Sequence, residues 1–182
     1  MTAIPELRTL VERAAGRRHM LEGLIESVPN DYRERQASGD DWNALDHLRH
    51  VATVDRMLVD LLKAAQESGE ELWAGDTSDE EELEARRVAL MDGVREQTFE
   101  ELVETMRESR EAAFEVVLGL PAAALEREVR VAGAPQGFPL RTYLAVWAEH
   151  DSEHEAAIRR AIETPPDATT LTLAARRARG SR

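Results

Sequence analysis

The chain has 182 residues, with 36 acidic and 23 basic side chains, a net charge of -13 and no cysteine. This length suits one domain with a real hydrophobic core. The acidic excess argues against binding to duplex nucleic acid or anionic membranes, because few cations would face the phosphates. No apolar run approaches the roughly 20 residues that span a bilayer, and the N-terminus lacks a secretory signal pattern, so we expect a cytoplasmic protein.

Apolar residues recur with a helical period along most of the chain, and glycines and prolines fall between these stretches, which predicts an all-α helix bundle. The first helix is expected from about Pro5 to Val28, with polar residues at 17–19 interrupting its apolar stripe. The second is expected from Asn43 to about Ser68. Asn43 and the aspartate three residues later match a capping box, in which each side chain binds a free N–H group at the helix start.

A polar, acidic loop is expected at 69–77, followed by a third helix to about Gly93. Ser78 and Glu81 have the spacing of a second capping box at its start. Thr98 repeats this pattern and opens a fourth helix, which ends where Pro121 cannot continue the hydrogen-bond ladder.

A short helical turn is expected at 122–128, and the last long helix from about Pro139 to Ile162. We expect one folded domain at 1–163. Residues 164–182 carry four arginines against one aspartate and no periodic apolar face, which predicts a disordered basic tail. The exclusion of nucleic acid therefore applies to the folded domain.

Two histidines, His150 and His154, are four residues apart in the last helix, so their rings project from one face. The apolar neighbours on this face predict that it points inward: Tyr143, Val146, Trp147 and Ile158. Two interpretations remain open from the spacing alone. The pair consists either of core histidines bonded to polar neighbours or of two ligands of one metal ion.

A third ligand could come from His47 or His50 in the second helix. His47 lies inside the apolar arc of that helix. However, with Asn43 as the cap, Trp42 and His47 occupy the two positions of a hydrophobic staple, which gives His47 a structural role. We favour His50, which is almost a turn deeper, and leave His47 as the alternative. His19 is expected at the surface.

The order of Trp42, His50 eight residues later, and the distant pair His150 and His154 resembles the DinB/YfiT-like superfamily of metal-binding four-helix bundles. The resemblance covers about 5–162. It implies a four-helix bundle with long crossover connections and a short extra helix. It also implies that His50, His150 and His154 are the metal ligands and that His47 lies outside the motif.

Three neutral imidazoles leave a divalent ion with open positions, as in catalytic sites. Zinc is expected first, and nickel and iron also suit imidazole. The chain has no cysteine, so a nucleophilic sulfur must come from an external thiol. Members of the resembled superfamily transfer bacillithiol, mycothiol or glutathione, or use mycothiol in an isomerisation. The leading hypothesis is a metal-dependent transferase that joins a thiol of the mycothiol or bacillithiol type to a small electrophile. Dimers are common in that superfamily, so the resemblance is compatible with a homodimer, and the sequence itself leaves the oligomeric state open.

Two alternatives stand beside this hypothesis. One is a metal-dependent hydrolase in which Asp151 or Glu149 carries a proton. The other is a non-enzymatic stress-response bundle that keeps the ion for stability. Among other residues, Trp73 could line the mouth of a pocket and Arg141 could hold the carboxylate of a thiol. Tyr143 and Trp147 are expected to pack.

Overall fold

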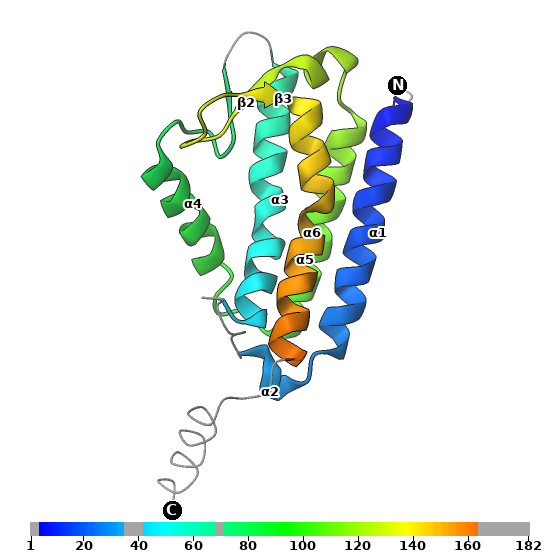
Figure 1. Cartoon of the computed structure of the whole chain (residues 1–182), viewed down its shortest axis with the longest axis vertical. Coiled ribbons are helices and arrows are strands. Elements are labelled where there is room, and N and C mark those ends of the chain that lie inside the picture. The colour runs from blue at the N-terminus through cyan, green and yellow to red at the C-terminus, as the bar shows by residue number, and fades with distance from the viewer. Residues whose placement is uncertain (1–3, 35–41, 68–70, 164–182) are drawn as a thin grey trace, which may run out of the picture.

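The computed structural model describes residues 4–34, 42–67 and 71–163. The expected basic tail at 164–182 lies outside this part of the chain. Four long helices form a bundle (Figure 1): α1 (Pro5–Ser27), α3 (Ala44–Gln66), α5 (Phe99–Leu118) and α6 (Leu140–Glu163). Three shorter helices join them: α2 (Asn30–Arg33), α4 (Glu80–Asp92) and the 3-10 helix η1 (Ala122–Glu126). The predicted all-α four-helix bundle is confirmed.

The long helices are arranged so that α1 packs mainly on α6 and α3 packs mainly on α5. In Figure 1, α1 and α6 run in one direction, and α3 and α5 run in the opposite direction. Two packed helices that run in the same direction, such as α3 and α5, need a connecting segment that passes back along the length of the bundle. The segment between α3 and α5, which includes α4, makes this long crossover. Among the described residues, no helix is long and apolar enough to cross a membrane.

The starts of α3 and α5 are fixed by the side chains that the sequence predicts. Asn43 accepts a hydrogen bond from the backbone N–H of Asp46, whose carboxylate accepts one from the N–H of Asn43. Thr98 and Glu101 form the same reciprocal pair at the start of α5. Each cap satisfies donors that a helix start leaves without partners.

The predicted cap of α4 is one residue too early. Asp79, and not Ser78, is the cap residue, and its carboxylate accepts a hydrogen bond from the N–H of Glu82. The hydroxyl of Thr77 accepts from the N–H of Asp79 and donates to the Glu82 carboxylate. These hydrogen bonds fix Asp79 as the residue at which α4 starts. The capping box predicted for Ser78 and Glu81 is therefore wrong by one residue.

A small sheet at one end of the bundle connects two of the loops (Figure 1). Its strands are β1 (Leu72–Trp73), β2 (Glu128–Arg130) and β3 (Phe138–Pro139), in that order. Strand β1 is parallel to β2 and strand β3 is antiparallel to it. Pro139 therefore ends a strand, where the sequence predicts the start of the last helix. Helix α6 begins one residue later, at Leu140, whose backbone N–H donates a hydrogen bond to the Arg127 carbonyl.

The core consists of two apolar clusters, one toward each end of the bundle. One contains Leu7, Leu62, Val117 and Leu144, and the other contains Leu21, Val51, Met106 and Ile158. Between them lie four charged side chains that are at most 4% exposed: Arg18, Asp55, Arg110 and Asp151. Each comes from a different long helix.

These four residues, which we call the buried charge network, pair with one another. The Asp151 carboxylate accepts from Nε of Arg18 at 2.8 Å and from Arg110 at 2.8 Å. The Asp55 carboxylate lies 3.2 Å from Arg18 and 3.0 Å from Nε of Arg110. Trp147 donates its indole N–H to Asp55 at 2.8 Å. The two positive and two negative charges compensate one another, which buried ions require.

Replacing Arg110 by methionine tests the buried charge network. The change leaves Asp55 and Asp151 with one fewer cation inside the core, and we expect a loss of about 3–5 kcal/mol in the free energy of unfolding. Arg107→Met is the matched control on the same helix, because the Arg107 side chain is 40% exposed and pairs with surface glutamates. That variant should lose about 0–1 kcal/mol. Urea denaturation measures both, and equal losses would contradict the account.

Candidate metal centre

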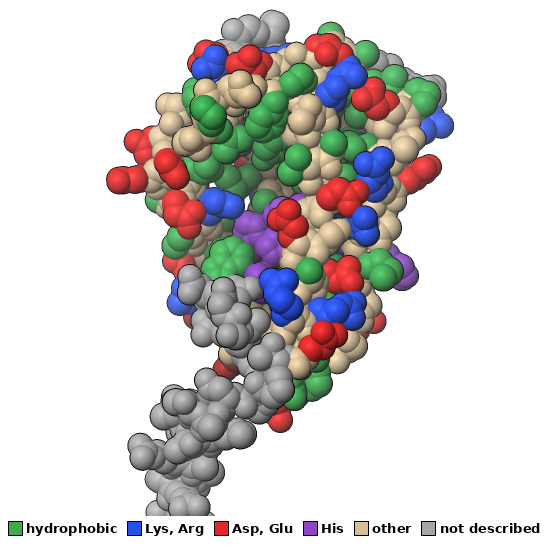
Figure 2. Space-filling view, viewed as in Figure 1, with side chains coloured by type: hydrophobic (Ala, Val, Ile, Leu, Met, Phe, Trp, Pro, Cys, Tyr) green, Lys and Arg blue, Asp and Glu red, His purple; other side chains and the backbone are tan. Residues whose placement is uncertain are grey.

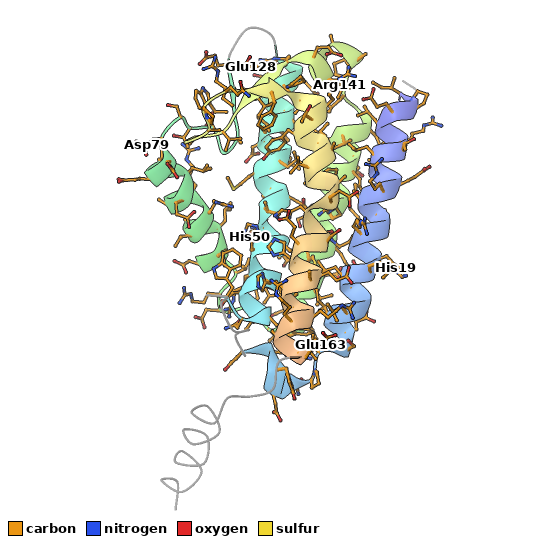
Figure 3. The ribbon with its side chains drawn as sticks, viewed as in Figure 1. His19, His50, Asp79, Glu128, Arg141 and Glu163 are labelled. Atoms are coloured by element: carbon orange, nitrogen blue, oxygen red, sulfur yellow. The ribbon has the colours of Figure 1, made fainter. Side chains whose placement is uncertain are left out.

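Three histidine rings from two helices meet halfway along the bundle. His50 belongs to α3 and lies near the middle of the bundle (Figure 3). Its ring centroid is 5.3 Å from that of His150 and 4.9 Å from that of His154, both of α6. Nε2 of His150 lies 3.4 Å from Nε2 of His50 and 3.2 Å from Nε2 of His154. One nitrogen from each ring lies within 4.8 Å of the others.

These distances are suitable for a metal ion. Two imidazole nitrogens at 2.0–2.1 Å from one tetrahedral ion are separated by about 3.3 Å. Two of the nitrogen pairs in the centre have nearly this separation. The helix spacing produces the geometry, because residues four apart stack on one side of α6 and that side faces α3. The donor set and its spacing therefore fit a single divalent ion.

Burial lowers the pKa of all three rings. The pKa of His50 falls to about 3, first through desolvation and then through the neighbouring His150 and Arg87. The pKa of His154 falls to about 2 through desolvation and the nearby histidines. Burial also lowers the pKa of His150, although Asp151 opposes this shift. All three rings are consequently neutral near pH 7, the form in which imidazole binds metals.

His47 lies next to the three converging rings but is not one of them. Its Nδ1 is 3.0 Å from Nδ1 of His154, the nitrogen on the far side of that ring from the centre. It also contacts Trp42, with ring centroids 5.4 Å apart, which is the staple contact that the sequence predicts. The structure thus brings His50 to the centre and places His47 behind His154.

Trp42 forms a wall of the centre, a role that the sequence analysis missed. Its ring centroid lies 5.1 Å from that of His50 and 6.3 Å from that of His154, with the latter rings nearly parallel. The signal was present in the sequence, because a residue just before a helix cap packs against the first turns of that helix. Trp42 limits the access of water to one side of the rings.

The two carboxylates considered as proton carriers are engaged with arginines. Asp151 is buried in the charge network with Arg18 and Arg110. Glu149 accepts a hydrogen bond from Arg17 at 2.8 Å on the outer side of the bundle. Both carboxylates therefore already have arginine partners.

The other residues that the sequence singled out lie in different parts of the bundle. Trp147 is buried, as expected, but Val146 is 64% exposed, so its predicted inward position is wrong. Val146 therefore lies on a solvent-facing side of α6. Arg141 pairs with Glu126 and Glu6 at the end of the bundle, far from His50 (Figure 3). His19 is exposed, as expected.

The buried charge network is the largest feature that sequence reasoning missed. In the sequence of the first helix, Arg18 only interrupts the apolar stripe. It follows buried Ala14 by four residues and precedes buried Leu21 by three, which is a core position. Asp55 and Arg110 occupy corresponding positions in their helices. When each of the four long helices has one charged residue at a core position, with two of each sign, these residues are expected to pair with one another.

A cavity of about 670 Å³ lies between α3, α4 and the segment around strand β1. Trp73 is part of its lining, as expected for a residue at a pocket mouth. Figure 2 shows this face of the molecule hollowed beside α4, with hydrophobic side chains in the upper part and histidines at the lower end. The cavity is large enough for a small molecule; its lining residues do not include His50, His150 or His154, and histidines lie at the lower end of the hollow in Figure 2.

Comparisons with known structures agree with this description. The mycothiol-dependent maleylpyruvate isomerase matches with a TM-score of 0.66 and 17% identity, over 87% of this chain and 63% of that chain. A histidine-to-alanine mutant of this isomerase matches with a TM-score of 0.68 and 16% identity. YfiT from Bacillus subtilis, described as a probable metal-dependent hydrolase with an unusual four-helix bundle topology, matches with a TM-score of 0.68 and 13% identity, over 85% of each chain. At these identities the likeness shows a shared fold. This chain spans less than two thirds of the isomerase.

A search among curated proteins gave no match. The family model of the DinB superfamily matches residues 14–158, which include all the long helices in whole or in part and the three converging histidines. The chain belongs to the DinB superfamily.

Proposed function

We propose that this protein is a divalent-metal-dependent enzyme that transfers a low-molecular-weight thiol, of the mycothiol or bacillithiol type, to a small electrophile. The observation that carries the proposal is the convergence of the Nε2 atoms of His50, His150 and His154 at metal-binding distances. These three residues would be the metal ligands. Zinc is the first candidate, because three neutral imidazoles form a common catalytic zinc site.

When bound, the ion supplies Lewis-acid chemistry and lowers the pKa of a coordinated thiol or water. Other residues of the chain orient and shield the three histidine rings. His47 contacts the rear nitrogen of His154 and so fixes which nitrogen of that ring faces the centre. Trp42 covers the rings on one side, which leaves access to them from the hollow beside α4.

Two observations support a thiol as the cosubstrate. The chain has no cysteine, so sulfur chemistry at this site requires an external thiol. One of the similar structures is an enzyme described as mycothiol-dependent. In the transfer, the thiol would lose its proton to solvent and its sulfur would form a new bond to the electrophilic carbon, while the leaving group of the electrophile departs with the electron pair of the bond that breaks, so no redox change is needed.

Metal-dependent hydrolysis is the second candidate, supported by the description of YfiT. It requires a group that accepts a proton from water. The two carboxylates that flank His150 in the sequence, Asp151 and Glu149, are paired with Arg18 and Arg17. This pairing makes hydrolysis the weaker proposal.

A turnover assay tests the transferase proposal. The zinc-loaded protein should accelerate the reaction of at least one of mycothiol, bacillithiol or glutathione with a chromogenic aryl halide, followed by absorbance. His150→Ala should reduce the rate to that of the uncatalysed reaction, whereas His19→Ala on the exposed side of α1 should leave it unchanged. Zinc binding without turnover for any of the three thiols would contradict the proposal.

The contact between His47 and His154 should contribute to metal affinity. His47→Phe keeps a ring against Trp42 but removes the nitrogen that meets His154, and we expect zinc to bind about 10- to 100-fold more weakly. Competition with a chromophoric chelator measures the affinity. Unchanged affinity would contradict the positioning role. A loss as complete as that in His50→Ala would instead make His47 a ligand.

The lowered histidine pKa values predict how the metal-free protein responds to acid. The unfolded chain takes up protons near the ordinary histidine pKa of 6.5, whereas folded His50 and His154 stay neutral down to about 3 and 2. Their contribution to stability is therefore complete above pH 6.5 and is lost as the pH falls below it, by about 1.4 kcal/mol per pH unit for each ring.

Urea unfolding between pH 7.5 and 4.5 measures this slope. His154→Gln should flatten it, and His19→Gln should not, because His19 is exposed. Parallel pH curves for the wild type and His154→Gln would contradict the prediction.

A further inference from the structure

The cavity beside α4 has apolar inner walls. Met57 and Leu61 of α3, Leu72 of strand β1 and Leu90 of α4 line it. Burying an apolar group against such walls is favourable, by roughly 25 cal/mol per Å² of apolar surface. The volume of about 670 Å³ suits a small organic molecule.

The charged residues of the lining are mostly acidic. Asp60, Glu67, Glu71 and Asp76 face one basic residue, Arg86. The Arg86 guanidinium donates to the Gly75 carbonyl at 2.7 Å and to Glu82, which lies outside the lining, at 2.7 Å. The guanidinium also lies 3.5 Å from the Asp76 carboxylate, so Arg86 pairs with both Glu82 and Asp76, and the other lining carboxylates are Asp60, Glu67 and Glu71. The cavity therefore presents a negative potential to an occupant.

Trp73 adds an aromatic surface to this acidic lining. Its indole N–H donates to the Glu71 carboxylate at 3.4 Å. The guanidinium carbon of Arg130 lies 5.8 Å from the centre of a Trp73 ring, and its Nε lies 4.0 Å from the Glu71 carboxylate and 3.0 Å from that of Glu128. The folded protein therefore already holds a cation of its own beside Trp73 and Glu71. An indole beside carboxylates is a combination that binds organic ammonium groups.

The cavity and the histidine centre share one face of α3. Met57 and Leu61 follow His50 by seven and eleven residues, which places them on the same side of the helix. Seven residues correspond to about 10 Å along the axis. Arg87 of α4 acts electrostatically on His50 and on Tyr143, so α4 borders both spaces. Figure 2 shows the two regions within one hollow.

We propose that the cavity binds a substrate with an apolar body and one organic ammonium group. The ammonium group lies against Trp73, Glu71 and Asp60, and the apolar body extends along α3 toward His50. This inference rests on the proposed function only in taking the cavity as the route to the histidines. The same lining disfavours a dicarboxylate such as the maleylpyruvate named for the similar isomerase.

Two probes with the same apolar body and opposite charges test the proposal: 4-phenylbutylammonium and 4-phenylbutyrate. Titration calorimetry at low ionic strength, on zinc-loaded and zinc-free protein, should show the cation binding at least about ten-fold more tightly in both, and salt should weaken it. The double variant Asp60→Asn with Glu71→Gln should reduce the preference below about three-fold. Asp92→Asn, on α4 but paired with Arg95 outside the lining, should leave it unchanged.

Ala64→Trp should abolish binding of both probes, because the indole fills the cavity. The circular dichroism spectrum of each variant reports whether the variant folds. If Ala64→Trp does not fold, the test rests on the double variant. Equal or tighter binding of the anion, a preference that survives the double variant, or no binding of either probe would overturn the proposal. Binding to the zinc-free protein is measured without any turnover, so this test does not depend on the transferase activity. If the cation preference is absent while the turnover that depends on His150 is normal, this inference is overturned and the proposed function is not.

Discussion

Two arginines and two aspartates, one from each long helix, pair in the middle of the bundle and restrict how the helices can be arranged. Arg18, Asp55, Arg110 and Asp151 are nearly inaccessible to solvent. A single unpaired charge at such depth costs several kcal/mol. Rotation of one helix, or a slide by one turn, would leave at least one of them without a partner. We infer that the network selects the helix register, whereas the two apolar clusters supply most of the stability.

The histidine centre depends on the same register. Asp55 follows His50 by five residues, and Asp151 directly follows His150. Trp147 adds a hydrogen bond from α6 to Asp55 of α3. The helices that carry the three imidazoles are therefore fixed to each other about one turn from the rings. Nitrogens that must meet within a few tenths of an ångström need such support, and rigid helices supply it better than loops.

Local sequence patterns predicted the parts of the fold that depend on neighbouring residues. The caps at Asn43 and Thr98 and the shared face of His150 and His154 follow from helix periodicity and backbone hydrogen bonding. The sheet could not be predicted in the same way, because strands of two or three residues pair across long sequence separations. The buried charge network was missed because each charge, considered in its own helix, only interrupts an apolar stripe. The choice of His50 over His47 rests on the predicted helix start, which gives His47 a place beside Trp42, and the family pattern agrees with it; the helical wheel alone would favour His47, which lies inside the apolar arc.

The central claim is that three imidazoles of this chain form one metal-binding centre. X-ray absorption spectroscopy on zinc-loaded protein tests it most directly. The account predicts one zinc per chain, with three imidazole nitrogens at about 2.0–2.1 Å, and a loss of one imidazole from the zinc sphere in His50→Ala. A chain that retains no divalent ion, or a zinc sphere that is unchanged in His50→Ala and loses an imidazole in His47→Phe, would contradict it.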